Sequence, residues 1–206
     1  ILPVVDEIGV VDSFSNDRTK EICLAKGARF IENPFRRHIV QKNFAIWQAA
    51  YPYILSLDAD EYLSEELTQS ILAIKEKWPM EAYRMNRLSS YGGKWIRYTG
   101  WYPDSKLRLW NRTLGVWGGD NPHDKVILHN RKTKVMHLKG SLFHEAYEDV
   151  TDFLDKVQAY SEIFAREKRF LLRSSPFKVF YKTAYSFFFN FFLKFGFLAG
   201  FQCTII

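Results

Sequence analysis

Short apolar runs alternate with stretches of helical period over the first sixty residues of the chain. The apolar runs have the length of buried strands, while the segments 19–26 and 41–50 have apolar positions and end residues typical of helices. Strands that alternate with helices favour a parallel sheet. We therefore expect an α/β fold with a mostly parallel sheet flanked by helices. The predicted strands are 7–12, 28–31 and 53–57.

The later part of the chain gives a weaker pattern. Residues 81–88 and 106–111 predict strands, and 149–168 predicts an amphipathic helix, because apolar residues recur there at i, i+3, i+4 and i+7. Glycines cluster at 92–93 and at 115–119. They indicate turns or close approaches of two backbones.

Carboxylates follow two of the predicted strands. Asp12 closes the first, and the third runs directly into Asp58 and Asp60, which are two residues apart and can point to one side. Ligands of open α/β sheets bind at such strand ends, and paired carboxylate oxygens suit Mg²⁺ or Mn²⁺. The alternative is a solvated acidic turn before a helix that starts at 64–66, since acids favour a helix N-terminus.

Six short tracts resemble, in order, the motifs of family 2 glycosyltransferases of GT-A fold. The second half of the set is similar to the bacterial branch that adds sugars to the lipopolysaccharide core. The resemblance implies a GT-A, Rossmann-like catalytic domain, with a C-terminal amphipathic helical appendage. The tracts are DSFSNDRT (12–19), QKNFA (41–45), LDADE (57–61), GWYPD with LRL (100–109), His123-Asp124, and FHEAY (143–147).

The resemblance also assigns a donor side to the site. It implies that Asp60, assisted by Asp58, holds Mg²⁺ or Mn²⁺ on the diphosphate of a nucleotide sugar, expected to be a UDP-sugar. His144 completes the metal shell in this assignment; the alternative is a structural histidine. Asp12, Asp58 and Lys42 are the expected nucleotide-binding residues.

On the acceptor side the resemblance implies a single inverting displacement. Asp124 is the expected general base, although family members usually carry Glu at this position. Trp101 and Tyr102 are expected to bind the acceptor, a lipopolysaccharide-core or other cell-envelope glycan or lipid, or else to be core residues. A haloacid-dehalogenase-like phosphatase is the alternative enzyme, but that family has Thr or Val where this chain has Tyr62.

The start of the chain bears on its domain organisation. Family members open with a strand and a helix before the counterpart of Asp12, whereas this chain begins at Ile1. We expect residues 1–148 to form the catalytic domain without its first strand and helix, and 149–206 to form a helical, membrane-associating segment. A non-catalytic, membrane-associated remnant of such a transferase is the alternative.

Charge is unevenly distributed along the chain. The net charge is +6; residues 1–165 hold 22 basic and 22 acidic residues, and residues 166–206 hold seven basic residues against Glu167. The basic end is also rich in Phe and Tyr, which predicts a helix lying on anionic lipid. Packing against the domain or a partner subunit is the alternative, and nucleic-acid binding is disfavoured because the basic residues adjoin apolar bulk. Two cysteines suit a reducing compartment, so we expect a cytoplasmic protein, peripheral on the inner face of the cytoplasmic membrane.

Overall fold

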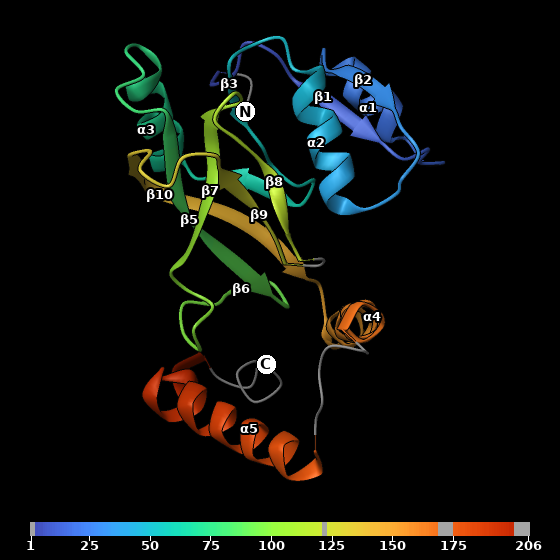
Figure 1. The fold of residues 1–206 in the computed structure, drawn as a ribbon, viewed down its shortest axis with the longest axis vertical. Helices are drawn as coiled ribbons and strands as arrows, with labels where there is room; N and C mark the ends of the chain where they lie inside the picture. Colours follow the sequence, from blue (N-terminus) through green and yellow to red (C-terminus); the bar gives the residue numbers. More distant parts are fainter. Residues whose placement is uncertain (1–2, 121–122, 169–174, 200–206) are drawn as a thin grey trace. The chain divides into compact units, whose positions relative to one another are not determined.

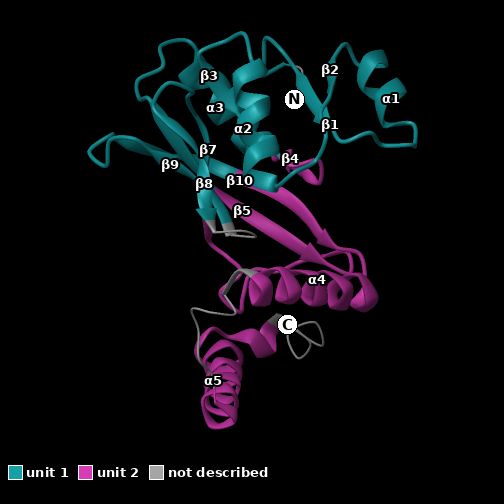
Figure 2. Cartoon of the chain, turned by 45° about the vertical axis from the view of Figure 1, so that its right-hand side comes forward, with its two compact units in different colours: residues 1–57, 65–85, 106–140 teal, residues 58–64, 86–105, 141–206 magenta. Residues whose placement is uncertain are grey.

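The computed structural model describes residues 3–120, 123–168 and 175–199, and Figure 1 labels its helices and strands in chain order. The chain divides into two compact units, coloured separately in Figure 2. Unit 1 consists of residues 1–57, 65–85 and 106–140, and unit 2 of residues 58–64, 86–105 and 141–206. Three long strands, β5, β7 and β10, begin in one unit and end in the other.

Unit 1 opens with a strand–helix–strand motif. Strand β1 (Gly9–Asp12) pairs in parallel with β2 (Arg29–Glu32), and α1 (Thr19–Ala25) connects them. The helix ends at Gly27, whose φ of 74° lies in the left-handed region that glycine adopts at no steric cost. In this parallel register Asp12 stands opposite Glu32, so the carboxyl ends of the two strands lie side by side.

The rest of unit 1 surrounds a core of large apolar side chains. Helix α2 (His38–Gln48) contacts β1 and β8 (Gly115–Asp120), and β8 pairs antiparallel with β9 (His123–Leu128). Strand β3 (Tyr53–Leu55) pairs antiparallel with β7 (Asp104–Asn111), and α3 (Glu65–Lys75) follows. The central core residues are Ile46, Ala82, Leu107, Trp110, Trp117 and Val126.

One glycine of β10 (Val135–Tyr147) is required by its neighbours. Gly140 has φ 91°, and a Cβ added there would lie 2.3 Å from the backbone nitrogen of Leu67 in the first turn of α3. That separation is far below van der Waals contact, so only glycine fits. The close approach packs α3 onto the strand and buries Leu67 and Ile71.

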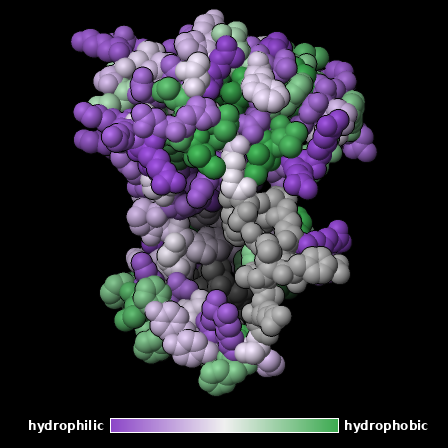
Figure 3. Space-filling model, viewed as in Figure 1, coloured by the Kyte–Doolittle hydropathy of each residue, from purple (hydrophilic) through white to green (hydrophobic). Residues whose placement is uncertain are grey.

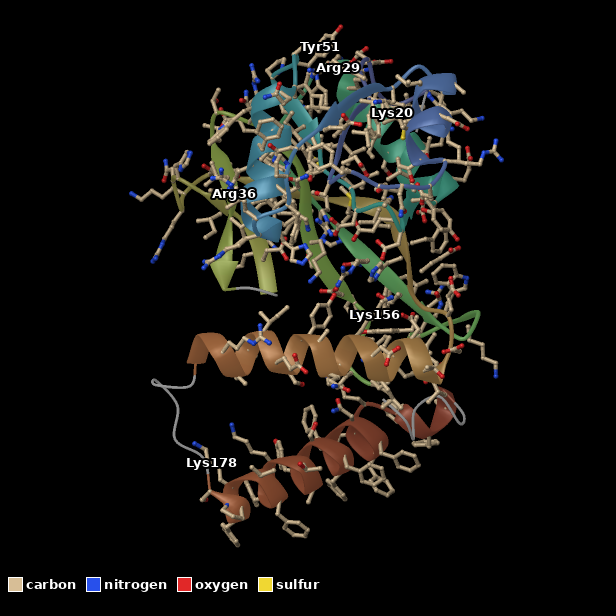
Figure 4. All side chains as sticks on the ribbon, turned by 90° about the vertical axis from the view of Figure 1, so that its right-hand side faces the viewer. Lys20, Arg29, Arg36, Tyr51, Lys156 and Lys178 are labelled. Carbon is tan, nitrogen blue, oxygen red and sulfur yellow. The ribbon has the colours of Figure 1, made fainter. Side chains whose placement is uncertain are left out.

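Unit 2 is built on the remainder of β5 (Ala82–Tyr91) and β10. Strand β4 (Glu61–Leu63) pairs antiparallel with β10, and β6 (Lys94–Trp95) pairs antiparallel with β5. Helix α4 (Val150–Lys168) packs Phe153 against Tyr91 and Tyr147, with ring centroids 5.6 and 5.0 Å apart. Lys156 on this helix (Figure 4) donates a hydrogen bond to the Ala146 carbonyl at 2.8 Å.

Helix α5 (Pro176–Phe188), a π-helical turn (Phe189–Leu193) and a 3₁₀ turn (Gly196–Ala199) end the described part of unit 2. Ser175 caps α5 by accepting the Lys178 N–H. Phe177 and Phe180 are 80% and 74% exposed, and Figure 3 shows hydrophobic and weakly polar residues with hydrophilic ones among them on this helix. No helix in the described ranges combines the length and apolarity needed to span a membrane.

The α/β fold is confirmed, but the expectation of a mostly parallel sheet is wrong for most strands. β1 and β2 pair in parallel, whereas the β3–β7, β4–β10, β5–β6 and β8–β9 pairs are antiparallel. Two of these antiparallel pairs, β5–β6 and β8–β9, join strands that are consecutive in the chain, and so short a connection permits only antiparallel pairing. Helices α4 and α5 lie in the segment 149–206 that was expected to be helical, while residues 169–174 and 200–206 of that segment lie outside the described residues.

Candidate functional site

The loop after β1 is folded around Asp12. The Ser15 backbone N–H and hydroxyl donate to its carboxylate at 2.7 and 2.6 Å. These hydrogen bonds, the one from the hydroxyl first, hold the pKa of Asp12 below its ordinary value. Gln41 of α2 donates to the Ser13 hydroxyl at 3.0 Å and accepts from Asn33 at 2.7 Å, so the helix also fixes the loop. The Asp12 carboxylate is thus held in place at a strand end by the loop that follows it.

Two predicted site residues of unit 1 form one ion pair. The Lys42 ammonium lies 2.8 Å from Oδ2 of Asp124, and the two side chains are 21% and 14% exposed. That oxygen is fully enclosed, and its contact with Lys42 is an ion pair rather than a well-directed hydrogen bond. The expected nucleotide-binding lysine and the expected base therefore share one location. Asp124 stands on β9, opposite Gly119 of β8; the side chain of its neighbour His123 lies outside the described residues.

The ring of Trp117 on β8 packs against this ion pair. The Lys42 ammonium lies 4.3 Å from its ring centroid and the Arg108 guanidinium 5.1 Å, both within range of cation–π attraction. The Asn43 side-chain amide donates to the backbone carbonyl of Trp117 and accepts from the backbone N–H of Trp117, both at 2.9 Å. These two hydrogen bonds hold α2 against the strand. Sequence reasoning missed Trp117 and Asn43, although Asn43 lies in the QKNFA tract.

In unit 2, Asp60 faces His144. Nε2 of the imidazole lies 3.3 Å from Asp60 Oδ2, and the Ser89 hydroxyl lies 3.0 Å from Nδ1. The hydrogen bond with His144 is the largest cause of a lowered pKa of Asp60, against the opposing effect of burial. The Glu145 N–H also donates to the Asp60 carbonyl at 3.0 Å. Asp60 and His144, which the sequence analysis assigned to one metal shell, are therefore neighbours.

The turn at Asp58 is held by a residue that sequence reasoning did not single out. Glu61 is fully buried, and its carboxylate accepts the Asp58 N–H at 3.1 Å. Arg87 approaches Glu61 at 3.4 Å and Asp104 at 2.9 Å. A buried carboxylate needs such partners to offset its lost hydration. Glu61, the third acid of LDADE, thus anchors the turn that carries the other two. Its position directly after the D-x-D pair was the sequence feature that could have indicated this role.

The carboxylate oxygen of Asp60 and the imidazole nitrogen of His144 are atom types that bind divalent cations. A carboxylate oxygen and an imidazole nitrogen 3.3 Å apart have the spacing of neighbouring ligands of one ion, and Ser89 orients the imidazole through its other nitrogen. Within the described ranges, however, no three His, Cys, Asp or Glu side chains gather closely enough to hold a metal. Asp60 and His144 would therefore supply two ligands, with the substrate's oxygens and water supplying others.

Trp101 and Tyr102, expected to bind the acceptor, are half-buried in unit 2. The Trp101 ring lies 5.8 Å from Tyr147, and the Arg97 guanidinium lies 5.6 Å from the Tyr102 ring. These contacts with Tyr147 and Arg97 are compatible with both alternatives given from the sequence, an acceptor contact or a core position.

The chain is similar in sequence to proteins that are named as glycosyltransferases. The chain is 28% identical to an uncharacterized glycosyltransferase of Rickettsia typhi over 174 residues, which is 80% of this chain and 59% of that protein. It is 27% identical over 217 residues to an uncharacterized glycosyltransferase of Rickettsia felis, covering 97% of this chain and 74% of the relative. The chain thus spans about three fifths of the length of the R. typhi relative.

Solved structures give a weaker likeness. The crystal structure of S. aureus TarS 1–349 has a TM-score of 0.43 at 12% identity, covering 77% of this chain and 56% of that one. The same fragment in complex with UDP has a TM-score of 0.39 at 16% identity, covering 52% of this chain and 38% of that one. The sequence profile of glycosyl transferase family 2 matches residues 4–128, from before β1 to the end of β9. Because that match covers more than half of the 206 residues, the chain belongs to glycosyl transferase family 2.

Proposed function

We propose that the protein is an inverting glycosyltransferase that moves a sugar from a nucleotide sugar, a UDP-sugar, to a lipopolysaccharide-core or other cell-envelope glycan or lipid. The observation that carries the proposal is the family match over residues 4–128, which includes Asp12, Lys42, Asp60 and Asp124. The family membership favours this activity over the phosphatase considered from the sequence. The donor, the acceptor and the lipopolysaccharide branch are inferences from the resemblance of the motifs.

Asp124 is the proposed general base. It would take the proton from the acceptor hydroxyl as that oxygen attacks the anomeric carbon of the donor sugar and the nucleoside diphosphate leaves. The Lys42 ammonium offsets the carboxylate's charge at 2.8 Å, and the acceptor hydroxyl must reach Asp124 within hydrogen-bond distance. A carboxylate held by one long, flexible cation suits this role, since Lys42 can turn to a phosphate oxygen without moving the backbone.

Asp60 and His144, assisted by Asp58, are the proposed holders of Mg²⁺ or Mn²⁺. When bound, the cation neutralises charge that develops on the leaving diphosphate. The chain's own contribution is orientation: Ser89 fixes the His144 ring, and Glu61 fixes the turn that carries Asp58. Asp12, held ionised by Ser15, would accept hydrogen bonds from the base or ribose of the nucleotide.

We further propose that α5 lies on the inner face of the cytoplasmic membrane, where a lipid-linked acceptor would be found. Its Phe177 and Phe180 side chains are largely exposed, and Lys178 and Lys182 stand among them. Apolar side chains beside lysines match the boundary between acyl chains and anionic headgroups. Figure 4 shows Lys178 at the start of this helix.

The activity is tested by incubating the full chain with a panel of UDP-sugars and Mn²⁺, with and without EDTA, and measuring UDP release and calorimetric binding of UDP. We expect Mn²⁺-dependent UDP binding and release, and Asp60→Ala should retain less than about a tenth of the release because lost charge neutralisation costs several kcal/mol. Asp155→Ala, at an exposed acid of α4, is the control. Absence of UDP binding with every metal would favour the non-catalytic alternative.

The membrane proposal is tested by vesicle sedimentation. Phe177→Ser with Phe180→Ser should reduce binding to phosphatidylglycerol vesicles and leave UDP binding intact, because α5 contributes no proposed donor ligand. Raising the salt concentration should weaken binding of the unaltered chain, since attraction to the surface fades over a Debye length. Phe35→Ser, at a residue 53% exposed in unit 1, is the matched control. Equal binding by all variants would favour packing of α5 against a partner.

A further inference from the structure

Three aromatic side chains gather on one face of unit 2, outside the residues already assigned a role. Tyr62 stands on β4, Trp95 on β6 and Phe143 on β10. Their ring centroids are 4.7 Å apart for Trp95 and Phe143, 5.3 Å for Tyr62 and Phe143, and 6.4 Å for Tyr62 and Trp95. We call these three residues the aromatic patch.

The aromatic patch is not simply core. Tyr62 is 41% exposed and Trp95 37% exposed, whereas Phe143 between them is half-buried. The Tyr62 and Trp95 rings meet at 71°, so the two exposed rings present differently oriented faces over Phe143. Three rings brought together from three strands bury much of their own surface, yet two of them keep a large apolar area in water, which favours a ligand contact.

The aromatic patch adjoins the proposed metal ligands along one strand pair. Tyr62 follows Asp60 by two residues and stands opposite Phe143, and the next pair in the register is Glu61 opposite His144. The Glu145 N–H donates to the Asp60 carbonyl, which ties the two strands at that point. A ligand that binds against Tyr62 therefore contacts the chain two residues from Asp60, where the donor's diphosphate is proposed to bind.

A carboxylate borders the aromatic patch. The Tyr62 hydroxyl donates to Glu145 at 3.4 Å, and Glu145 is exposed. Aromatic ring faces carry partial negative charge and attract the C–H groups on one side of a pyranose ring, while a carboxylate accepts hydrogen bonds from its hydroxyls. Apolar surface with a few polar groups at its border is the usual composition of a small-ligand site.

We propose that Tyr62, Trp95 and Phe143 bind a pyranose ring of the acceptor glycan, with Glu145 accepting from its hydroxyls. The proposal rests on the proposed function for the word acceptor, but the binding of a pyranose ring can be measured without any transfer. It adds a second aromatic contact to the expected pair Trp101 and Tyr102.

The test is saturation-transfer NMR of the full chain with the methyl glycosides of glucose, galactose and mannose at millimolar concentration. We expect transfer to the ring C–H protons of at least one glycoside, and a Kd raised about two- to ten-fold by Trp95→Ala, the range expected for the loss of one aromatic contact. Tyr62→Phe should change the Kd less than Tyr62→Ala, because it keeps the ring and loses only the hydroxyl. Trp47→Ala, at a residue 72% exposed on α2, should leave the Kd unchanged.

The outcomes separate this proposal from the proposed function. Glycoside binding that Trp95→Ala weakens by the expected factor supports the aromatic patch even if UDP does not bind, and UDP binding without any glycoside signal overturns the patch alone. Glycoside binding with an unchanged Kd in Trp95→Ala also overturns it. If Trp95→Ala loses its circular dichroism spectrum, Tyr62→Ala and Trp95→Phe supply the comparison, and unchanged Kd values in both overturn the proposal.

Discussion

The two units each hold one charged pair of the candidate site, and the pairs differ in the partner of the carboxylate. In unit 1, Asp124 faces the Lys42 ammonium at 2.8 Å, and both side chains are largely buried. In unit 2, Asp60 faces the His144 imidazole at 3.3 Å, and the Asp60 side chain is 45% exposed. An ammonium has no lone pair for a metal, whereas a neutral imidazole does.

This difference supports the different roles that we propose for the two carboxylates. Asp124 is enclosed and faces a flexible ammonium, so its proposed role as a base requires Lys42 to turn away and the substrate hydroxyl to take its place. Asp60 is accessible and stands beside a nitrogen ligand, which suits a group that gains a cation. The identity of the neighbouring residue, more than the carboxylate itself, therefore separates the two roles, and each prediction below changes one member of this comparison.

The largest expected effect is on transfer. Asp124→Asn removes the proposed base but keeps its shape, so transfer should fall by about 10² to 10⁴ while UDP binding persists. The measurement is the initial rate of transfer, with UDP binding by calorimetry on the same sample. A comparable loss in Asp120→Asn or Glu145→Gln, with Asp124→Asn active, would show that the base is misassigned.

The next effect is on stability. Lys42→Met leaves the largely buried Asp124 carboxylate without its ammonium, which should lower the free energy of unfolding by about 2 kcal/mol. Lys20→Met breaks the more exposed pair with Glu32, whose side chains are 55% and 42% exposed, and should cost less than about 1 kcal/mol. Urea unfolding of both variants measures the difference. Equal losses would mean that burial does not distinguish these ion pairs.

Local sequence patterns predicted the elements that rest on local causes. The helix over 19–26 follows from Gly27 at its end, and the helix over 149–168 follows from its apolar spacing; both are present as α1 and α4. Strands β8 and β10 were missed. The glycines at 115–119 indicated either turns or close approaches of two backbones, and the structure shows the second at Gly115, where a Cβ would lie 2.9 Å from the Ile127 carbonyl oxygen of the paired strand.

The site was predictable where a motif is contiguous and not where partners are distant in sequence. Asp58 and Asp60 could be placed together because they are two residues apart, and Asp12 because it closes a strand. The contact of Lys42 with Asp124, and that of His144 with Ser89, join separate elements, so they depend on strand pairing and helix packing. The role of Glu61 as an anchor was not predicted, because its burial depends on Arg87 and Asp104.

A smaller effect is expected on metal affinity. Ser89→Ala removes the hydroxyl that lies 3.0 Å from Nδ1 of His144, so the imidazole loses its orienting partner. Such partners typically contribute 10- to 100-fold in affinity, and we expect about ten-fold weaker Mn²⁺ binding, measured by the paramagnetic relaxation of water protons. Ser90→Ala changes the neighbouring β5 residue and is the control. If both variants bind Mn²⁺ as the unaltered chain does, His144 is a structural histidine rather than a metal ligand.

The smallest expected effect is the part of the pH dependence of stability that is due to Asp60. Because the hydrogen bond with His144 lowers the pKa of Asp60 in the folded state, the ionised carboxylate stabilises the fold at pH values above the unfolded pKa, about 3.9. This contribution is lost as the pH falls through the lowered folded pKa. The unaltered chain should thus exceed Asp60→Asn by less than about 1 kcal/mol at neutral pH, given the exposure of Asp60, and the two should converge below the unfolded pKa. Urea unfolding across this pH range measures the convergence, with Asp155→Asn as the exposed control. A difference that stays constant with pH would mean that the carboxylate and His144 do not form this hydrogen bond in solution.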